Sequence, residues 1–326
     1  MPDLSTSYMG LKLKNPIIAA SSGLTKSTAK IIDCYNSGVG AIVMKSVFEE
    51  AFAQKDFGIA EGTPYHTESY DYLRSELELQ YGPREYLDII NEAKTRVDIP
   101  IIASINCVSD KYWPQYAKQF QDAGADALEL NIFKTATSIS EEGRDLENMY
   151  YKIIETVKEQ VTIPVALKIG IYFTALPHFA SQLARKGADA LVLFNRFTEP
   201  DINIDKMKLS TTFSFSTSFD LYKPLRWTAL LSGKVGCDIA ASTGVKSGKD
   251  VIKLLLAGAS AVQVASLLYQ KGFDQVEDML RELTAWMKEH NFDSIADFKG
   301  KLSFEETSSP ETYLRAQFIE KIRGVE

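Results

Sequence analysis

The chain has 326 residues, 45% of them hydrophobic and 24% charged, which is the composition of a soluble globular protein. Its formal net charge of −7 at pH 7 argues against nucleic acid or an anionic membrane surface as its main partner. The three cysteines lie far apart, which argues against a disulfide framework or a cysteine-bound metal cluster and is typical of a cytoplasmic protein.

Short apolar runs recur along the chain, and none approaches the ~18 residues that a membrane-spanning helix needs. Each run is mostly apolar rather than alternating, as in buried parallel strands, because helices cover both faces of such a sheet. The polar stretch Met1–Asn15 precedes the runs and lacks the apolar core of a signal peptide. In chain order the eight predicted strands are Pro16–Ala20, Ala41–Met44, Pro100–Ile105, Ala127–Leu130, Pro164–Leu167, Ala190–Phe194, Asp238–Ala241 and Ala261–Val264.

Amphipathic stretches separate these runs and predict helices at Ser27–Asn36, Pro83–Arg96, Trp113–Asp122, Arg144–Gln160, Pro177–Lys186, Gly248–Ala257 and Asp274–His290. A glycine turn precedes each even-numbered strand, as in Ala123–Ala127 and Lys186–Ala190, because glycine takes the left-handed conformation after a helix at little cost. Repeated strand–helix units require right-handed crossovers and a parallel sheet. The sequence therefore predicts an α/β fold, a single (β/α)8 TIM barrel over residues 1–303. The charged tail, residues 304–326, is either an added helix or a flexible end.

Three of the predicted loops that follow strands are long. They are Val47–Gly82, Ile132–Gly143 and Arg196–Pro224. All three lie on the C-terminal face, where barrels of this kind carry their active sites. We therefore expect the functional site on this face.

A polar or glycine position closes each predicted strand. Because the carboxyl ends of barrel strands meet at one mouth, these positions are expected to converge. They are Ser21 and Ser22, Lys45 and Ser46, Asn106, Asn131, Lys168, Asn195, Thr243 and Gly244, and Ser266. The simpler alternative is an ordinary polar rim, in which Lys45 or Lys168 pairs with Glu129 on the fourth strand.

The chemistry of these strand ends favours flavin mononucleotide (FMN). Two lysines within such a ring are costly unless a negative group lies near them. Asparagines offer donors and acceptors that suit the amide edges of a planar heterocycle. Thr243-Gly244 and Ser247-Gly248 precede a helix whose free amides attract an anion, and barrels often bind phosphate after strands seven and eight.

The same residues resemble the dihydroorotate dehydrogenase family, and the similarity runs from Leu4 to Leu302. The shared motifs are Asn15-Pro16, Ala20–Gly23, Met44–Ser46, Glu129–Asn131, Ala166–Lys168, Tyr222–Leu225, Thr243–Asp250, Leu256–Ala259, Gln263-Val264 and Ser294–Leu302. The resemblance implies an FMN-dependent oxidoreductase of pyrimidine biosynthesis, most like the soluble cytoplasmic branch and commonly a homodimer. In this reaction an active-site base removes a proton from dihydroorotate and flavin N5 accepts a hydride.

The resemblance also implies roles for individual residues. FMN is expected to contact Ser22, Lys45, Ser46, Asn106, Asn131, Lys168, Asn195, Gly244 and Ser266, and we add Thr243 to this cofactor set. Lys45 and Asn131 are expected to face the pyrimidine as well, and we add Asn195 to this substrate set.

Two segments depart from the family pattern. The family follows strand four with Asn-x-Ser-Cys-Pro-Asn, whose cysteine is the base, whereas this chain has Asn131–Ala136 with Lys134 at the cysteine's position. The family's pyrimidine-binding asparagine loop is replaced by Gly62–Gly82. We therefore predict a retained cofactor half and a rebuilt substrate half, with Lys134 and Lys45 as candidate catalytic residues. Other candidate bases are Thr135, Thr137, Ser138, Cys107, His66 and His178.

Three functions stay open at this point. The first is oxidation of dihydroorotate, or a related dihydropyrimidine, to orotate. The second is the same flavin chemistry on another small saturated or unsaturated acid. The third is a phosphate-binding barrel without redox work, such as a lyase, a binding protein or a subunit of a complex. Because the chain has no CxxC pair, an iron–sulfur electron partner must be another chain. Fumarate, NAD and a partner subunit remain alternative electron acceptors.

Overall fold

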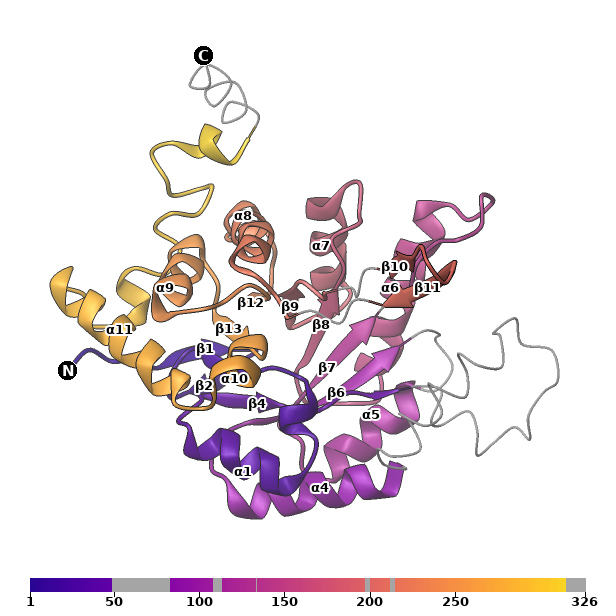
Figure 1. Ribbon diagram of the computed structural model, residues 1–326, viewed down its shortest axis with the longest axis horizontal. Coiled ribbons are helices and arrows are strands. Elements are labelled where there is room, and N and C mark those ends of the chain that lie inside the picture. The colour runs from indigo at the N-terminus through magenta and orange to yellow at the C-terminus, as the bar shows by residue number, and fades with distance from the viewer. Residues whose placement is uncertain (49–82, 108–112, 133, 197–199, 212–214, 315–326) are drawn as a thin grey trace.

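The computed structural model describes residues 1–48, 83–107, 113–132, 134–196, 200–211 and 215–314. Within this part of the chain, eight parallel strands close into a barrel and helices pack around it (Figure 1). The predicted single (β/α)8 fold is therefore confirmed.

The barrel strands coincide with the predicted apolar runs to within two residues at each end. They are β3 (Ile17–Ala19), β4 (Ala41–Val43), β6 (Ile101–Cys107), β7 (Ala127–Ile132), β8 (Val165–Ile169), β9 (Ala190–Leu193), β12 (Asp238–Ser242) and β13 (Ala261–Val264). Their order is β4–β3–β13–β12–β9–β8–β7–β6, and pairing of β4 with β6 closes the ring. The short β5 (Val47–Phe48) continues the pairing along β6.

Seven helices of the described chain match the predicted ones to within two residues at each end. They are α1 (Thr28–Asn36), α4 (Pro83–Arg96), α5 (Trp113–Asp122), α6 (Gly143–Lys158), α7 (Leu176–Arg185), α9 (Gly248–Ala257) and α11 (Gln275–Glu289). The four glycines of the predicted turns all have positive φ angles: Gly38, Gly124, Gly187 and Gly258. These turns therefore end their helices as expected.

Two α-helices of the described residues were not predicted. α8 (Tyr222–Leu231) begins inside the stretch that was predicted as a loop, and it tolerates Pro224 because that residue lies in its first turn. α10 (Ser266–Lys271) has only six residues and follows β13 directly. The same predicted loop also contains the antiparallel pair β10 (Pro200–Asn203) and β11 (Lys208–Thr211).

An N-terminal hairpin, also not predicted, closes one end of the barrel. It consists of β1 (Thr6–Tyr8) and β2 (Leu11–Leu13). Tyr8, Met9 and Leu13 are buried against the barrel interior. Room for them comes from small interior side chains, namely Ala41, Ala127, Ala166, Ala190, Ala240 and Ala261. Most of these alanines begin their strands, so the hairpin plugs the N-terminal end and leaves the C-terminal end for the site.

We expect Leu13→Ala to lower the free energy of unfolding by about 2–5 kcal/mol, because it leaves a cavity under a closed barrel end. The Leu13 side chain is fully buried among the interior alanines. Leu11→Ala is the matched control on the same hairpin, since Leu11 is only partly buried, and its effect should be clearly smaller. Urea denaturation of both variants tests whether the hairpin seals the barrel. An equal decrease in the free energy of unfolding for the two variants would show that it does not.

The remaining predicted segments are described only in part. Most of the long loop Val47–Gly82 lies outside the described residues, as does the tail from residue 315. The described part of the tail contains a 3-10 turn at Pro310–Tyr313, whose tyrosine hydroxyl donates to the Leu302 carbonyl at 2.5 Å. The predicted division at residue 303 therefore stays a prediction. Among the described helices, none is both long enough and apolar enough to cross a membrane.

Candidate active site

A cavity of about 220 Å³ opens at the carboxyl ends of the barrel strands, and we call it the mouth cavity. Half of the predicted cofactor-binding residues line it: Lys168, Asn195, Thr243, Gly244 and Ser266. The other lining residues are Ala20, Ser21, Phe194, Arg196, Ser216, Ser242, Val245, Gln263, Val264 and Ala265. Side chains from β8, β9, β12 and β13 thus meet at one place, as the strand-end pattern predicted.

The turn after β12 gives the mouth cavity a wall of backbone. Thr243 and Gly244 both have positive φ angles, 84° and 82°. A Cβ atom at Gly244 would lie 2.2 Å from the Leu221 backbone nitrogen, so only glycine fits there. On the facing side, the Ser266 hydroxyl accepts a hydrogen bond of 3.2 Å from the Ser216 amide. Backbone and hydroxyl groups at this end of the cavity are the kind that bind an anion.

Two amides around the start of α9 already donate to carboxylates. Asp250 accepts from the Lys246 amide at 3.0 Å, and Glu282 accepts from the Lys249 amide at 3.2 Å. The free amides of this helix start were expected to face an anion, and for the other amides of the turn this stays a prediction.

Cationic side chains flank this end of the site. Arg196 lines the mouth cavity, and Lys246 follows the glycine turn. Burial, and after it the charge of Lys271, lowers the pKa of Lys246. Its ammonium group donates to the Gln270 side chain at 2.8 Å. Three positive groups near one another favour a negative group between them.

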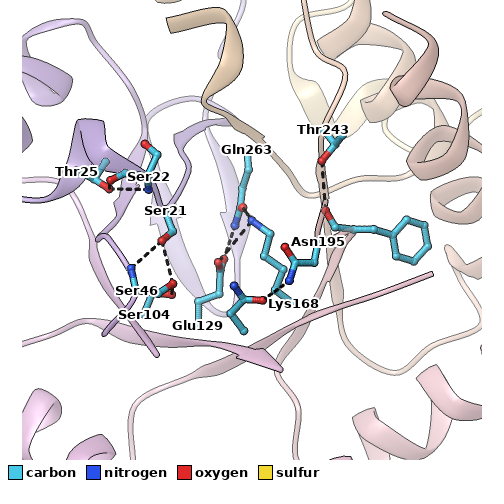
Figure 2. Close-up of polar contacts among 12 residues, drawn as sticks. Ser21, Ser22, Thr25, Ser46, Ser104, Glu129, Lys168, Asn195, Thr243 and Gln263 are labelled. Carbon is cyan, nitrogen blue, oxygen red and sulfur yellow. Dashed lines mark hydrogen bonds and ion pairs between the residues drawn. The ribbon is translucent and has the colours of Figure 1, made fainter. Parts of the chain in front are cut away.

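Three buried side chains form a polar triangle beneath the mouth cavity (Figure 2). Lys168 on β8 donates to the Gln263 carbonyl oxygen at 3.0 Å, and Gln263 on β13 donates through its amide nitrogen to Glu129 on β7. The Lys168 ammonium lies 3.8 Å from the other Glu129 oxygen. The alternative that paired Lys168 with Glu129 is confirmed, and Lys168 also lines the cavity.

A chain of hydroxyl groups supports the opposite wall (Figure 2). The hydroxyl oxygens of Ser21 and Ser46 lie 3.0 Å apart, and those of Ser46 and Ser104 lie 2.8 Å apart. Ser104 is fully buried, and its amide donates to the Tyr86 hydroxyl at 3.0 Å. This series of hydroxyl groups ends in the core at Ser104, so it fixes the orientation of the Ser21 and Ser46 hydroxyls.

The asparagines form a second group at the mouth. The Asn195 amide donates to the Asn131 carbonyl oxygen at 2.7 Å. Asn131 in turn lies in register with Asn106 on one neighbouring strand and with Lys168 on the other. Lys45 is partly buried, and its ammonium lies 5.8 Å from the centre of the Phe48 ring. Ser22 caps a 3-10 turn by accepting from the Leu24 amide at 3.3 Å. Six of the eleven predicted strand-end residues thus line the mouth cavity, and the other five end or follow the barrel strands β3, β4, β6 and β7.

The sequence similarity now decides the family. The family model described as dihydroorotate dehydrogenase matches residues 3–287. The chain belongs to the dihydroorotate dehydrogenase family. The resemblance inferred from the motifs is confirmed, and so is the prediction of an oxidoreductase acting on CH–CH bonds.

Individual relatives span nearly the whole chain. The catalytic subunit of dihydroorotate dehydrogenase B (NAD(+)) from Thermoplasma acidophilum is 28% identical over 308 residues, covering 92% of this chain and 99% of the relative. The protein of the same name from Oceanobacillus iheyensis is 29% identical, covering 90% and 97%. The NAD-dependent dihydropyrimidine dehydrogenase subunit PreA of Escherichia coli is 24% identical, covering 91% of this chain and 76% of the relative.

Lys134, the predicted base, is not among the residues that line the mouth cavity. It is exposed, and its ammonium pairs with Glu141 seven residues along the same loop. It lines a separate cavity of about 250 Å³ together with Tyr172 and Phe173, among others. An ammonium group has no lone pair with which to accept a proton. Lys134 can therefore act as a base only after it separates from Glu141 and loses its proton.

Four of the other candidate bases are no better placed than Lys134. Thr135, Thr137, Ser138 and His178 are all exposed. His66 and the side chain of Cys107 lie outside the described residues. Burial raises the pKa of the Cys34 and Cys237 thiols to about 12, so both stay protonated at neutral pH.

Sequence reasoning named Gln263 only within a shared motif and gave it no role, and it missed Ser104 altogether. Gln263 is the single polar residue of the buried strand Ala261–Val264, and Ser104 is the single polar residue of the predicted apolar run Pro100–Ile105. That isolation was the available signal, because buried polar side chains need hydrogen-bond partners. Ser216 and Arg196 gave no such signal, since they come from loops.

Proposed function

We propose that this chain is an FMN-dependent oxidoreductase that oxidises dihydroorotate, or a closely related dihydropyrimidine, to the unsaturated product. The observation that supports it most is the mouth cavity, where the Lys168 ammonium, the Asn195 amide and the Gly244 turn meet at the carboxyl ends of the strands. Membership of the dihydroorotate dehydrogenase family supports redox chemistry on a dihydropyrimidine in this cavity.

The residues of the mouth cavity fit FMN. The left-handed turn at Thr243-Gly244 and the Ser266 hydroxyl suit a phosphate, because no Cβ atom obstructs the backbone at Gly244. The Lys168 ammonium and the amides of Asn131 and Asn195 suit the polar edge of a flat ring. The proposed FMN contacts are Ser22, Lys45, Ser46, Asn106, Asn131, Lys168, Asn195, Thr243, Gly244 and Ser266.

The chemistry that bound FMN supplies is acceptance of a hydride at N5. The protein supplies binding, orientation and a proton acceptor. Lys45, Asn131 and Asn195 would bind the pyrimidine, and the bond between the two asparagines at 2.7 Å fixes the orientation of both amides. Lys134, once released from Glu141 and deprotonated to the neutral amine, would accept at Nζ the proton that leaves the substrate carbon.

The electrons are proposed to leave through another chain. Relatives are named catalytic subunits of an NAD(+)-dependent enzyme, and this sequence has no CxxC pair of its own. We therefore propose a partner subunit that carries electrons to NAD. A homodimer of the barrel also remains a proposal.

An absorbance spectrum of the purified protein, followed by anaerobic addition of dihydroorotate, tests the function. A yellow protein that bleaches supports both the cofactor and the substrate. A yellow protein that stays yellow keeps FMN and points to a different small acid, which the replaced loop Gly62–Gly82 and the ion-paired Lys134 would explain. A colourless protein that does not take up added FMN overturns the redox proposal.

Lys134→Ala should slow flavin reduction by dihydroorotate by about 10²- to 10⁴-fold, the usual contribution of a general base, without loss of FMN. Stopped-flow absorbance of the loaded protein measures the rate. The matched control is Lys118→Ala, because Lys118 is also an exposed lysine in an ion pair, with Asp122 at 2.6 Å on α5. An unchanged rate in Lys134→Ala would leave the base to another residue.

A further inference from the structure

A buried carboxylate without a task in the proposed chemistry lies beneath the mouth cavity. The Glu129 side chain is 1% exposed, and its Oε1 atom accepts no hydrogen bond from the described protein. A buried carboxylate strongly disfavours folding unless it is paired and hydrogen-bonded. Its presence at this place in the barrel therefore needs an explanation beyond packing.

The contacts of Glu129 lead to Lys168 through one amide. Gln263 is also 1% exposed, and its two amide atoms bond to different partners. An ammonium group only donates and an ionised carboxylate only accepts, so the carbonyl of Gln263 must face Lys168 and its nitrogen must face Glu129. The three residues come from three different strands of the closed barrel, and each restrains the next.

This triangle has two effects on Lys168. The hydrogen bond from Nζ to Gln263, at 3.0 Å, fixes the direction of the side chain and leaves its other N–H groups for the mouth cavity. The carboxylate at 3.8 Å offsets part of the positive charge that the cavity experiences. Charges at such short range interact strongly where water is excluded.

We propose that Glu129 is a positioning residue that acts through Lys168. By way of Gln263 it aims the ammonium at the mouth cavity, and its carboxylate offsets part of the attraction that this ammonium exerts on the electrons of an FMN bound there. This inference rests on the FMN part of the proposed function, and it does not depend on which substrate the enzyme oxidises.

Glu129→Gln tests the proposal, because it removes the negative charge and keeps an oxygen that can accept from Gln263. The midpoint potential of bound FMN is measured by anaerobic titration with reference dyes. We expect Glu129→Gln to favour reduction of bound FMN by about tenfold, which is about 30 mV for a two-electron couple. The control Glu155→Gln removes an exposed carboxylate from an ion pair with Lys186 and should leave the potential unchanged.

The same substitution in a Lys168→Met background separates action through Lys168 from direct action on the flavin. Without the Lys168 ammonium, Glu129→Gln should shift the midpoint potential of bound FMN by only a small fraction of the shift seen when Lys168 is present. If Lys168→Met does not fold, Gln263→Met replaces it, because that change removes both hydrogen bonds of the triangle. A shift that persists undiminished in these backgrounds overturns the positioning role.

The outcomes also separate this proposal from the proposed function. A protein that takes up no FMN overturns both. A loaded protein whose potential does not change in Glu129→Gln overturns this inference alone. A loaded protein that shows the shift but is not reduced by dihydroorotate supports this inference and rejects only the proposed substrate.

Discussion

Replacing Lys168 with methionine should lower the free energy of unfolding by about 3–5 kcal/mol, the usual effect of removing one partner of a buried ion pair. Methionine keeps much of the apolar stem but leaves the buried carboxylate of Glu129 without its counter-ion. It also leaves the Gln263 carbonyl oxygen without the donor that now lies 3.0 Å away. A weaker affinity for FMN should accompany the loss of stability, because Lys168 lines the mouth cavity.

Urea denaturation of the protein without FMN measures the stability effect on its own. The double variant Lys168→Met with Glu129→Gln should recover most of the loss, since neither charge then remains buried. Lys186→Met is the matched control, because its pair with Glu155 is exposed and contributes less than about 1 kcal/mol. A double variant as unstable as Lys168→Met would show that the buried charge is not the cause.

Gly244→Ala should cost about 2–5 kcal/mol of folding stability and sharply reduce FMN uptake. The left-handed conformation, with φ of 82°, disfavours any residue with a Cβ by about 1–2 kcal/mol. The new Cβ atom would also lie 2.2 Å from the Leu221 nitrogen and 2.7 Å from the Asp220 carbonyl carbon. Both neighbours are backbone atoms, so the turn itself must move, at about 1–3 kcal/mol more.

Gly38→Ala provides the control for the conformational part of this effect. Gly38 has a φ of 91°, and a Cβ atom there would meet nothing within 4 Å. The Gly38→Ala variant should therefore lose only about 1–2 kcal/mol of folding stability, from the left-handed conformation alone, and should keep FMN. Urea denaturation and the ratio of flavin to protein absorbance compare the two variants. Equal losses of stability with full FMN uptake in both would remove the turn from the cofactor site.

The strand ends were predictable because of two regular features of the sequence. Buried parallel strands are apolar on both faces, so runs such as Ala127–Leu130 and Pro164–Leu167 stood out. In a parallel barrel every strand has its carboxyl end at the same mouth. The polar residue that follows each strand is therefore expected at that mouth. Lys168, Asn195 and Gly244 line the cavity for this reason.

Other features left little trace in the sequence. The three-residue strands Thr6–Tyr8 and Leu11–Leu13 are too short to show a periodic pattern, yet they fill one end of the barrel. The pairing of Lys134 with Glu141 depends on how one loop folds, and neither residue is unusual in a polar stretch. Propensity and periodicity act over neighbouring residues and therefore do not register such contacts.

The sequence by itself determined the barrel, the face that carries the site and the residues that close the strands, because these follow from local apolar periodicity and from the rules of parallel connection. Only the tertiary structure decided which of those residues meet. Gln263 and Glu129 are 134 positions apart, and the hydrogen bond between them exists because the sheet closes on itself. Closure brings β7, β8 and β13 around one buried space, and there the need to pair a buried carboxylate selects its partners.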